Sequence, residues 1–144
     1  MKHFNLAFLL AVLSFNLSAA HHEKEQQEGF TGLISSEVFD LAGEMDLYVE
    51  KYQSCGDAEN EKHYHPVGTL VYMIDGKAAS LSSGEWEEYS KGSYWFEPSM
   101  WVHGGNEPDQ PQFGDNQCRQ TLVIRVSRKG EEPTAVSYTH LTLP

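Results

Sequence analysis

Apolar and polar residues alternate over short stretches of this chain, and glycine-containing turns separate the stretches. From Met45 to Gln53, for example, methionine, leucine and valine occupy alternate positions between charged residues. This period of two is typical of β-strands with one buried face. The same reasoning predicts strands at Met45–Gln53, His63–Ile74, Lys77–Ser82, Glu85–Tyr89, Ser93–Glu97, Trp101–Asn106 and Gln120–Ser127.

No long stretch of the chain has a helical period, and Glu37 to Gly43 stays open between a helical turn and a strand. Asp75-Gly76 lies between apolar runs, which predicts a hairpin with the next segment as the return strand. Many short strands at regular spacing predict an all-β sandwich or barrel in a single domain.

The two ends of the chain do not follow the strand pattern. Residues 1–20 combine a positive start, an apolar stretch and small residues before the expected cleavage point, which is typical of a secretory signal peptide. We therefore expect a secreted or periplasmic protein that leaves the membrane after cleavage. We expect residues 21–30 to form a polar, flexible N-terminus, residues 31–130 to form the barrel and residues 131–144 to form a flexible tail.

The net charge narrows the classes of binding partner, and the cysteine count allows one disulfide. The net charge is −11, and removing residues 1–20, whose one charged residue is Lys2, gives −11 − 1 = −12. Because nucleic acids and anionic lipids repel such a chain, we expect neither as a partner. Cys55 and Cys118 permit one disulfide in a secreted protein, and two free thiols remain the alternative.

Three histidines are the candidate metal ligands of this chain. His63 and His65 are separated by one residue, so a regular strand would point both to one face. His103 follows beyond a further turn and strand. Three neutral imidazoles from two strands can hold one metal ion and leave coordination positions open for a small molecule.

The spacing of these residues resembles the cupin superfamily. Its first motif has a His-x-His, an acidic residue and a later glycine, which correspond here to His63, His65, Thr69 and Gly76. The second motif runs from a glycine through a proline to a histidine, and these residues are Gly92, Pro98 and His103. The resemblance covers roughly residues 47–126. It implies a cupin double-stranded β-helix, also called a jelly-roll barrel, with His63, His65 and His103 as metal ligands.

Two positions depart from the family pattern. Thr69 stands where the family has its metal-binding glutamate, and Met100 stands where the second motif has a glycine. Glu97 is the candidate replacement carboxylate or catalytic base, although its place at a strand end favours a surface residue. Thr69 would line the pocket, and for Trp101 a pocket wall and core packing remain equal alternatives.

The resemblance implies a dioxygenase-like enzyme that acts on a small organic molecule through the three-histidine site. The expected cofactor is a divalent metal ion, with Fe²⁺ first and Mn, Ni, Cu or Zn as alternatives, because imidazole binds them all. The same ligands also fit a non-redox isomerase or lyase, a non-catalytic sensor or carrier, and a barrel that has lost its site. The sequence leaves the oligomeric state open, and the resemblance implies a homodimer as one alternative.

Overall fold

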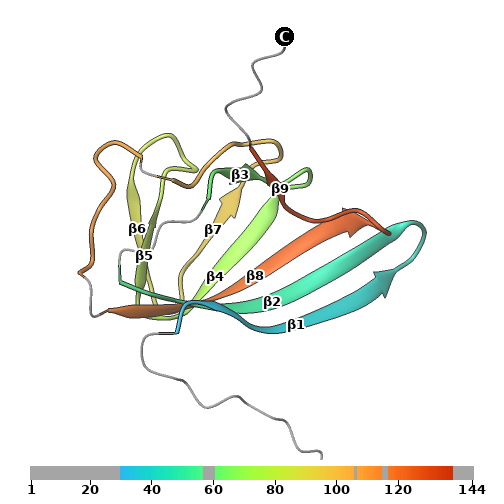
Figure 1. The fold of residues 1–144 in the computed structure, drawn as a ribbon, viewed down its shortest axis with the longest axis horizontal. Coiled ribbons are helices and arrows are strands. Elements are labelled where there is room, and N and C mark those ends of the chain that lie inside the picture. Colours follow the sequence, from blue (N-terminus) through green and yellow to red (C-terminus); the bar gives the residue numbers. More distant parts are fainter. Residues whose placement is uncertain (1–29, 57–60, 106, 115–116, 138–144) are drawn as a thin grey trace, which may run out of the picture.

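The computed structural model describes residues 30–56, 61–105, 107–114 and 117–137. The predicted signal peptide and residues 21–29 of the predicted flexible N-terminus lie outside these ranges. Within them, no helix has the length and apolar character needed to cross a membrane. The described strands are β1 Gly32–Leu41, β2 Met45–Cys55, β3 His63–Tyr64, β4 Thr69–Asp75, β5 Lys77–Ser80, β6 Glu87–Ser90, β7 Tyr94–Glu97, β8 Cys118–Arg128 and β9 Ala135–Val136 (Figure 1).

Five strands form one antiparallel sheet in the order β1-β2-β8-β4-β7. The longest ladder joins β2 and β8, from Met45 opposite Arg128 to Cys55 opposite Cys118. Both strands had been predicted from their alternation, and both extend beyond the predicted bounds by a few residues. The open segment Glu37 to Gly43 is mostly strand, because it pairs with β2 as part of β1.

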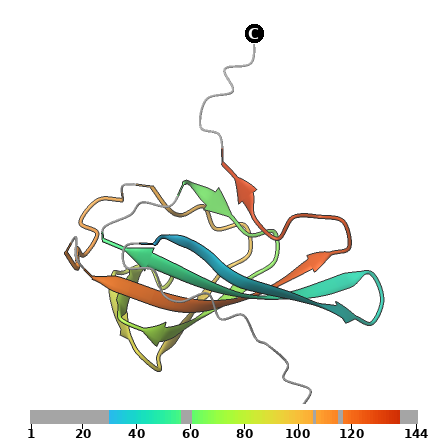
Figure 2. The same cartoon turned by 60° about the horizontal axis from the view of Figure 1, so that its bottom comes forward.

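Two small sheets, β3-β9 and β5-β6, complete the fold (Figures 1 and 2). Residues from all three sheets line one cavity of about 670 Å³, among them Tyr52 and Val123 of the large sheet, Ser80 of β5, and His63 and Val136 of β3-β9. The interior of the barrel is therefore a hollow, of a size suited to a small organic molecule.

The predicted hairpin at Asp75-Gly76 is wrong, although the chain does turn there. β4 pairs with β7 and β8, whereas β5 pairs with β6, so the turn carries the chain from one sheet to another. Gly76 has a φ of 78°, and a Cβ there would lie 2.6 Å from the carbonyl oxygen of Cys118. A glycine is needed because β8 passes against the turn.

Two further expectations need correction. The predicted strand His63–Ile74 is interrupted between β3 and β4, where Pro66 lacks the N–H that a strand ladder requires. The predicted flexible tail, residues 131–144, is wrong for residues 131–137, because β9 pairs with β3 and the Ser137 N–H donates to the Lys62 carbonyl. Residues 138–144 lie outside the described ranges.

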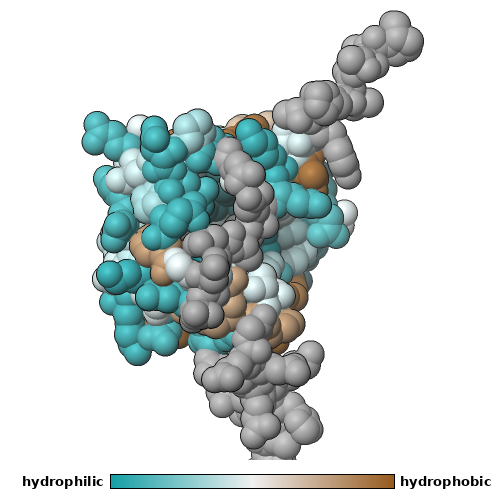
Figure 3. All heavy atoms as spheres, turned by 60° about the vertical axis from the view of Figure 1, so that its left-hand side comes forward, coloured by the Kyte–Doolittle hydropathy of each residue, from teal (hydrophilic) through white to brown (hydrophobic). Residues whose placement is uncertain are grey.

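Polar side chains occupy much of the barrel interior along β2 and β8. The buried polar residues of these strands are Glu50, Gln53, Gln120, Arg125 and Ser127. Arg125 forms an ion pair with Glu50, and its guanidinium donates to the Tyr52 hydroxyl at 3.1 Å. Burial of such groups is tolerated when they find partners, and of the Arg125 guanidinium only the Nε atom is buried without one. The outer face is mostly hydrophilic where the left-hand side of Figure 1 comes forward (Figure 3).

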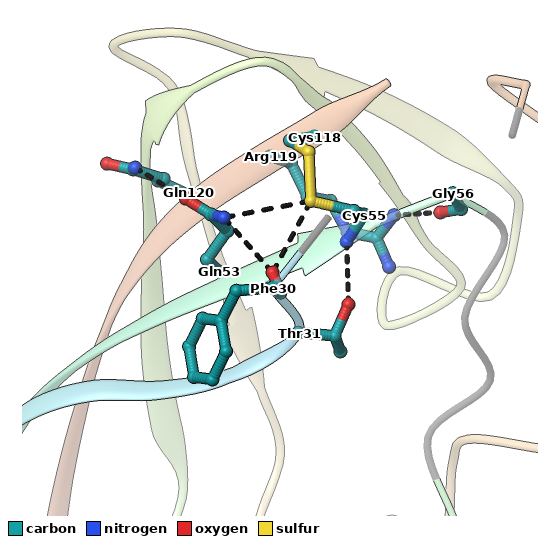
Figure 4. Close-up of a disulfide and its surroundings, with 8 residues drawn as sticks. All are labelled: Phe30, Thr31, Gln53, Cys55, Gly56, Cys118, Arg119 and Gln120. Atoms are coloured by element: carbon teal, nitrogen blue, oxygen red, sulfur yellow. Dashed lines mark hydrogen bonds between the residues drawn. A yellow bond between two sulfur atoms is a disulfide. The ribbon is translucent and has the colours of Figure 1, made fainter. Parts of the chain in front are cut away.

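A disulfide between Cys55 and Cys118 closes one end of the β2–β8 ladder (Figure 4). The two Cα atoms are 4.0 Å apart and the residues are 63 positions apart in sequence. The alternative of two free thiols is thereby excluded. Beside the bridge, the Gln53 amide donates to the Phe30 carbonyl and the Gln120 amide donates to Gln53, each at 3.0 Å (Figure 4).

Candidate metal centre

Backbone hydrogen bonds bring the three predicted histidines together. His63 and His103 face one another in an antiparallel bridge, each N–H donating to the other's carbonyl at 2.9 Å. His65 lies just beyond β3, and its carbonyl accepts from the Met100 N–H at 2.8 Å. One ring nitrogen of each histidine lies within 4.8 Å of the other two. The predicted strand at Trp101–Asn106 is reduced to this bridge within the described residues.

Each histidine has its Nδ1 atom tied to a backbone carbonyl. Nδ1 of His63 lies 2.7 Å from the Glu61 carbonyl and Nδ1 of His103 lies 3.0 Å from the Trp101 carbonyl. For His65 the partner is the Pro133 carbonyl, at 3.2 Å. Because a carbonyl oxygen only accepts, each Nδ1 carries the proton, and a neutral ring then presents an Nε2 lone pair. This arrangement is typical of histidines that ligate a metal.

Glu97 points into the site rather than to the surface, so the surface position favoured by the sequence is wrong. The residue is 8% exposed. Its Oε2 atom lies 3.1 Å from Nε2 of His65 and 3.4 Å from Nε2 of His103, and its Oε1 atom accepts from the Trp95 indole at 3.0 Å. Glu97 is the cross-strand partner of Thr69, so it projects from the position opposite the family's usual glutamate.

The electrostatics of this cluster favour a charged carboxylate. Burial raises the pKa of Glu97, but hydrogen bonds from the rings of His103 and His65, which form when those rings are protonated on both nitrogens, outweigh it and bring the pKa down to about 2. Burial lowers the pKa of His103, and the hydrogen bond to Glu97 outweighs that effect and raises the pKa overall. Burial lowers the pKa of His63. The carboxylate is therefore ionised beside rings that each present a lone pair when neutral.

Protonation of a ring, which the raised pKa of His103 favours, or a bound metal ion resolves this conflict. With every Nδ1 proton directed at a carbonyl, Nε2 of a neutral His65 or His103 and Oε2 of Glu97 are acceptors facing acceptors. Two ligand atoms bound at right angles to one ion through bonds of about 2.1 Å lie about 3.0 Å apart. The separations of 3.1 and 3.4 Å between Glu97 and the two rings match this value. The donor set thus fits a divalent metal ion.

The two remaining predicted site residues differ in whether they line the cavity. Thr69 is fully buried and does not line the cavity, so its predicted place in the pocket wall is wrong. Its side chain is shorter than that of Glu97 opposite, which occupies the wall instead. Trp101 does line the cavity, and its ring stacks on His103 with centroids 4.4 Å apart and an interplanar angle of 9°.

The sequence did not predict the residues from a distant part of the chain that contact the His65 ring. Pro133 and Thr134, which contact His65, lie in the segment predicted as a flexible tail.

Met100, the departure from the motif glycine, has a φ of 64°, in the region that glycine favours. Trp86 and Trp95 join Trp101 in the cavity wall, so all three tryptophans of the chain surround the same space.

Comparisons with known proteins concern the fold. No family model matches the chain. No curated protein matches it either. Among solved structures, a protein with a double-stranded β-helix domain from Klebsiella pneumoniae is 18% identical, with a TM-score of 0.49, over 78% of this chain and 89% of that one. The polyketide cyclase RemF from Streptomyces resistomycificus is 15% identical, with a TM-score of 0.48, over 74% and 83%.

A third match is a cupin-like protein from Thermotoga maritima, 17% identical, with a TM-score of 0.45, over 71% of this chain and 74% of that one. At these identities and TM-scores the likeness is no more than a similarity and does not bear on function. Within the described residues the chain forms an all-strand, antiparallel arrangement, as the sequence predicted, and the histidines of the two spaced motifs lie together in it.

Proposed function

We propose that this chain is a secreted or periplasmic metalloprotein that holds a divalent ion, Fe²⁺ first, at His63, His65 and His103, with Glu97 as the carboxylate ligand. We further propose a dioxygenase-like reaction on a small organic molecule. The observation that carries the proposal is a group of three histidine ring nitrogens within 4.8 Å of one another, with the Glu97 carboxylate against two of the rings and every Nδ1 beside a carbonyl. An ion makes all of these contacts favourable at once.

The chain's own residues would hold and orient the substrate. The cavity of about 670 Å³ opens beside the histidines, and its tryptophan walls suit a molecule with a flat apolar face. Glu97 is fixed on one side by the Trp95 indole, so its free oxygen stays directed at the centre. When bound, the ion supplies Lewis-acid chemistry and, as iron, oxygen activation.

A non-redox isomerase or lyase is the second candidate, and the position of Glu97 favours it. A carboxylate that is 8% exposed and adjoins a substrate-sized cavity is placed to accept a proton from a bound molecule. In that reaction Glu97 would exchange a proton with substrate, and no oxidant would be consumed.

The test begins with metal content by elemental analysis of the chain from His21 onward, without a histidine tag. We expect about one equivalent of metal per chain, lost in a His63→Ala, His103→Ala double variant. A His140→Ala variant, which changes a histidine outside both motifs, serves as the control and should keep its metal. Absence of metal after reconstitution with Fe²⁺, Mn²⁺ and Zn²⁺ would overturn the proposal.

An oxygen electrode then separates the two candidate reactions. The metal-loaded protein is screened against small diketones, thiols and phenols. Oxygen uptake that requires both substrate and His103 supports the dioxygenase. Conversion of substrate without oxygen uptake, and lost in Glu97→Gln with the metal retained, would replace it with the isomerase or lyase.

A further inference from the structure

The C-terminal segment closes over the histidine centre. β9 pairs with β3, placing Val136 opposite His63 and Ala135 opposite Tyr64. The Ser137 N–H donates to the Lys62 carbonyl at 2.9 Å. Figures 1 and 2 both show this strand lying alongside β3. A segment that reads as an irregular tail is thus fastened by its backbone to the strand that carries a candidate metal ligand.

Two groups from this segment meet the rear nitrogen of His65. Nδ1 of His65 lies 3.2 Å from the Pro133 carbonyl oxygen and 3.3 Å from the Thr134 hydroxyl oxygen. The same hydroxyl accepts a hydrogen bond from the Arg125 guanidinium. A hydroxyl oxygen has two lone pairs, so Thr134 can accept from Arg125 and from the Nδ1 proton of His65 together.

Arg125 is itself immobilised inside the barrel. Its guanidinium pairs with Glu50 and donates to the Tyr52 hydroxyl at 3.1 Å. Glu50 also accepts from Tyr52 and from Ser36, each at 3.3 Å. A buried ion pair costs desolvation energy and adds little net stability on its own, whereas it fixes the geometry of the groups around it. Here the group that the guanidinium reaches next is Thr134.

We propose that Thr134, held by the buried Arg125–Glu50 pair, is a positioning residue that acts together with the Pro133 carbonyl to keep the proton of His65 on Nδ1 and turn Nε2 toward the metal centre. Because Arg125 can only donate, it occupies one lone pair of the hydroxyl and leaves the other for the imidazole. The consequence for metal binding rests on the proposed function. The effect on the position of the proton in the His65 ring does not rest on the proposed function, because it is expected in the metal-free chain as well.

The first arm of the test measures Zn²⁺ affinity by chelator competition in the full chain. Thr134→Val keeps the shape of the side chain and removes the oxygen, and we expect affinity to fall roughly 10- to 100-fold, as when other second-layer partners of metal-bound histidines are removed. Thr134→Ser restores the oxygen and should lie within about threefold of wild type. Ser127→Ala is the matched control. The Ser127 hydroxyl donates to the carbonyl of Glu131, in the segment that joins β8 to β9, and its hydrogen bond does not involve His65.

The second arm needs no metal. Long-range ¹H–¹⁵N spectra of the metal-free chain, recorded above the pH at which histidine is charged, report which ring nitrogen of His65 is protonated. Wild type and Thr134→Ser should show the Nδ1–H form, and Thr134→Val a mixture. The same form in all three variants would overturn the proposal, as would an unchanged Zn²⁺ affinity in a folded Thr134→Val. If wild type bound no metal, the proposed function would fail and the spectra would still decide this point.

Discussion

The disulfide end of the barrel and the histidine centre are both built from polar groups that adjoin the same cavity, yet they differ in one respect. At the disulfide end the side-chain amides form a series in which each donor has an acceptor: Gln120 donates to Gln53, and Gln53 donates to the Phe30 carbonyl (Figure 4). At the histidine centre, neutral rings would direct the lone pairs of His65 and His103 at the carboxylate of Glu97.

This difference separates a structural region from a binding region. A set of polar groups that is complete within the chain has no need of a further component. A set that is complete only with a cation is organised for a ligand, and it lowers the stability of the metal-free chain. The two regions should therefore respond in opposite ways to metal and to substitution, which gives four predictions.

The largest effect should come from the disulfide. A Cys55→Ser, Cys118→Ser variant loses a bridge that closes a loop of 63 positions, and we expect about 4 kcal/mol less stability toward urea. The variant should keep its metal affinity within about threefold, because the bridge lies outside the donor set. A loss of metal binding in a chain that remains folded would show that the two regions are not independent.

The next effect concerns Glu97→Gln. The amide can donate to an Nε2 lone pair, so the substitution makes the histidine centre resemble the Gln53–Gln120 pair. At mildly alkaline pH we expect the metal-free variant to be more stable than wild type by about 1 kcal/mol, while its metal affinity falls roughly 10- to 100-fold. Thermal unfolding with and without Zn²⁺ measures both.

The matched control for that experiment is Glu61→Gln, which removes an exposed charge near the centre and keeps the carbonyl that holds His63. It should leave both quantities close to wild type. If Glu97→Gln shifted metal-free stability and metal affinity in the same direction, the contrast between the two regions would be wrong.

A smaller effect is expected at Trp101. Its ring stacks on His103 at 4.4 Å, and aromatic pairs of this kind contribute about 0.5–1.5 kcal/mol beyond area burial. Trp101→Leu should therefore weaken metal binding roughly 3- to 10-fold by releasing the imidazole. Tyr94→Leu, at an exposed aromatic of β7, should have no such effect in the same chelator competition. Equal effects of both substitutions would refute the role of the stack.

The smallest effect is expected at Met100. This residue is 60% exposed and has a φ of 64°, which costs a non-glycine residue about 1 kcal/mol. Met100→Gly should raise the free energy of unfolding by about 0.5–1 kcal/mol while the N–H bond to the His65 carbonyl is kept. A destabilised variant in urea unfolding would show that the methionine side chain contributes packing instead.

The sequence predicted those features that depend on local pattern. β2 and β8 followed from alternation, which is a property of neighbouring residues, and the set of three histidines followed from the resemblance of two motifs to a known family. The inward direction of Glu97 could not be predicted in this way. It depends on the register that places Glu97 opposite Thr69, and a strand end gives no sign of which face is buried.

Contacts between distant segments were equally inaccessible. Thr134 and His65 are 69 positions apart, and nothing in the composition of residues 131–137 indicates that they pair with β3. The hairpin at Asp75-Gly76 failed for a related reason. A turn signal fixes the local change of direction but not which strand the chain pairs with next, and here β5 joins β6 in another sheet.

The most direct test of the histidine centre is X-ray absorption spectroscopy at the edge of an ion bound to the chain, with iron and zinc measured separately. We predict scattering from three imidazole rings together with a carboxylate oxygen that is lost in Glu97→Gln. An ion bound with fewer than three imidazoles, or surrounded by water oxygens alone, would contradict the claim that the histidine centre is organised around a cation.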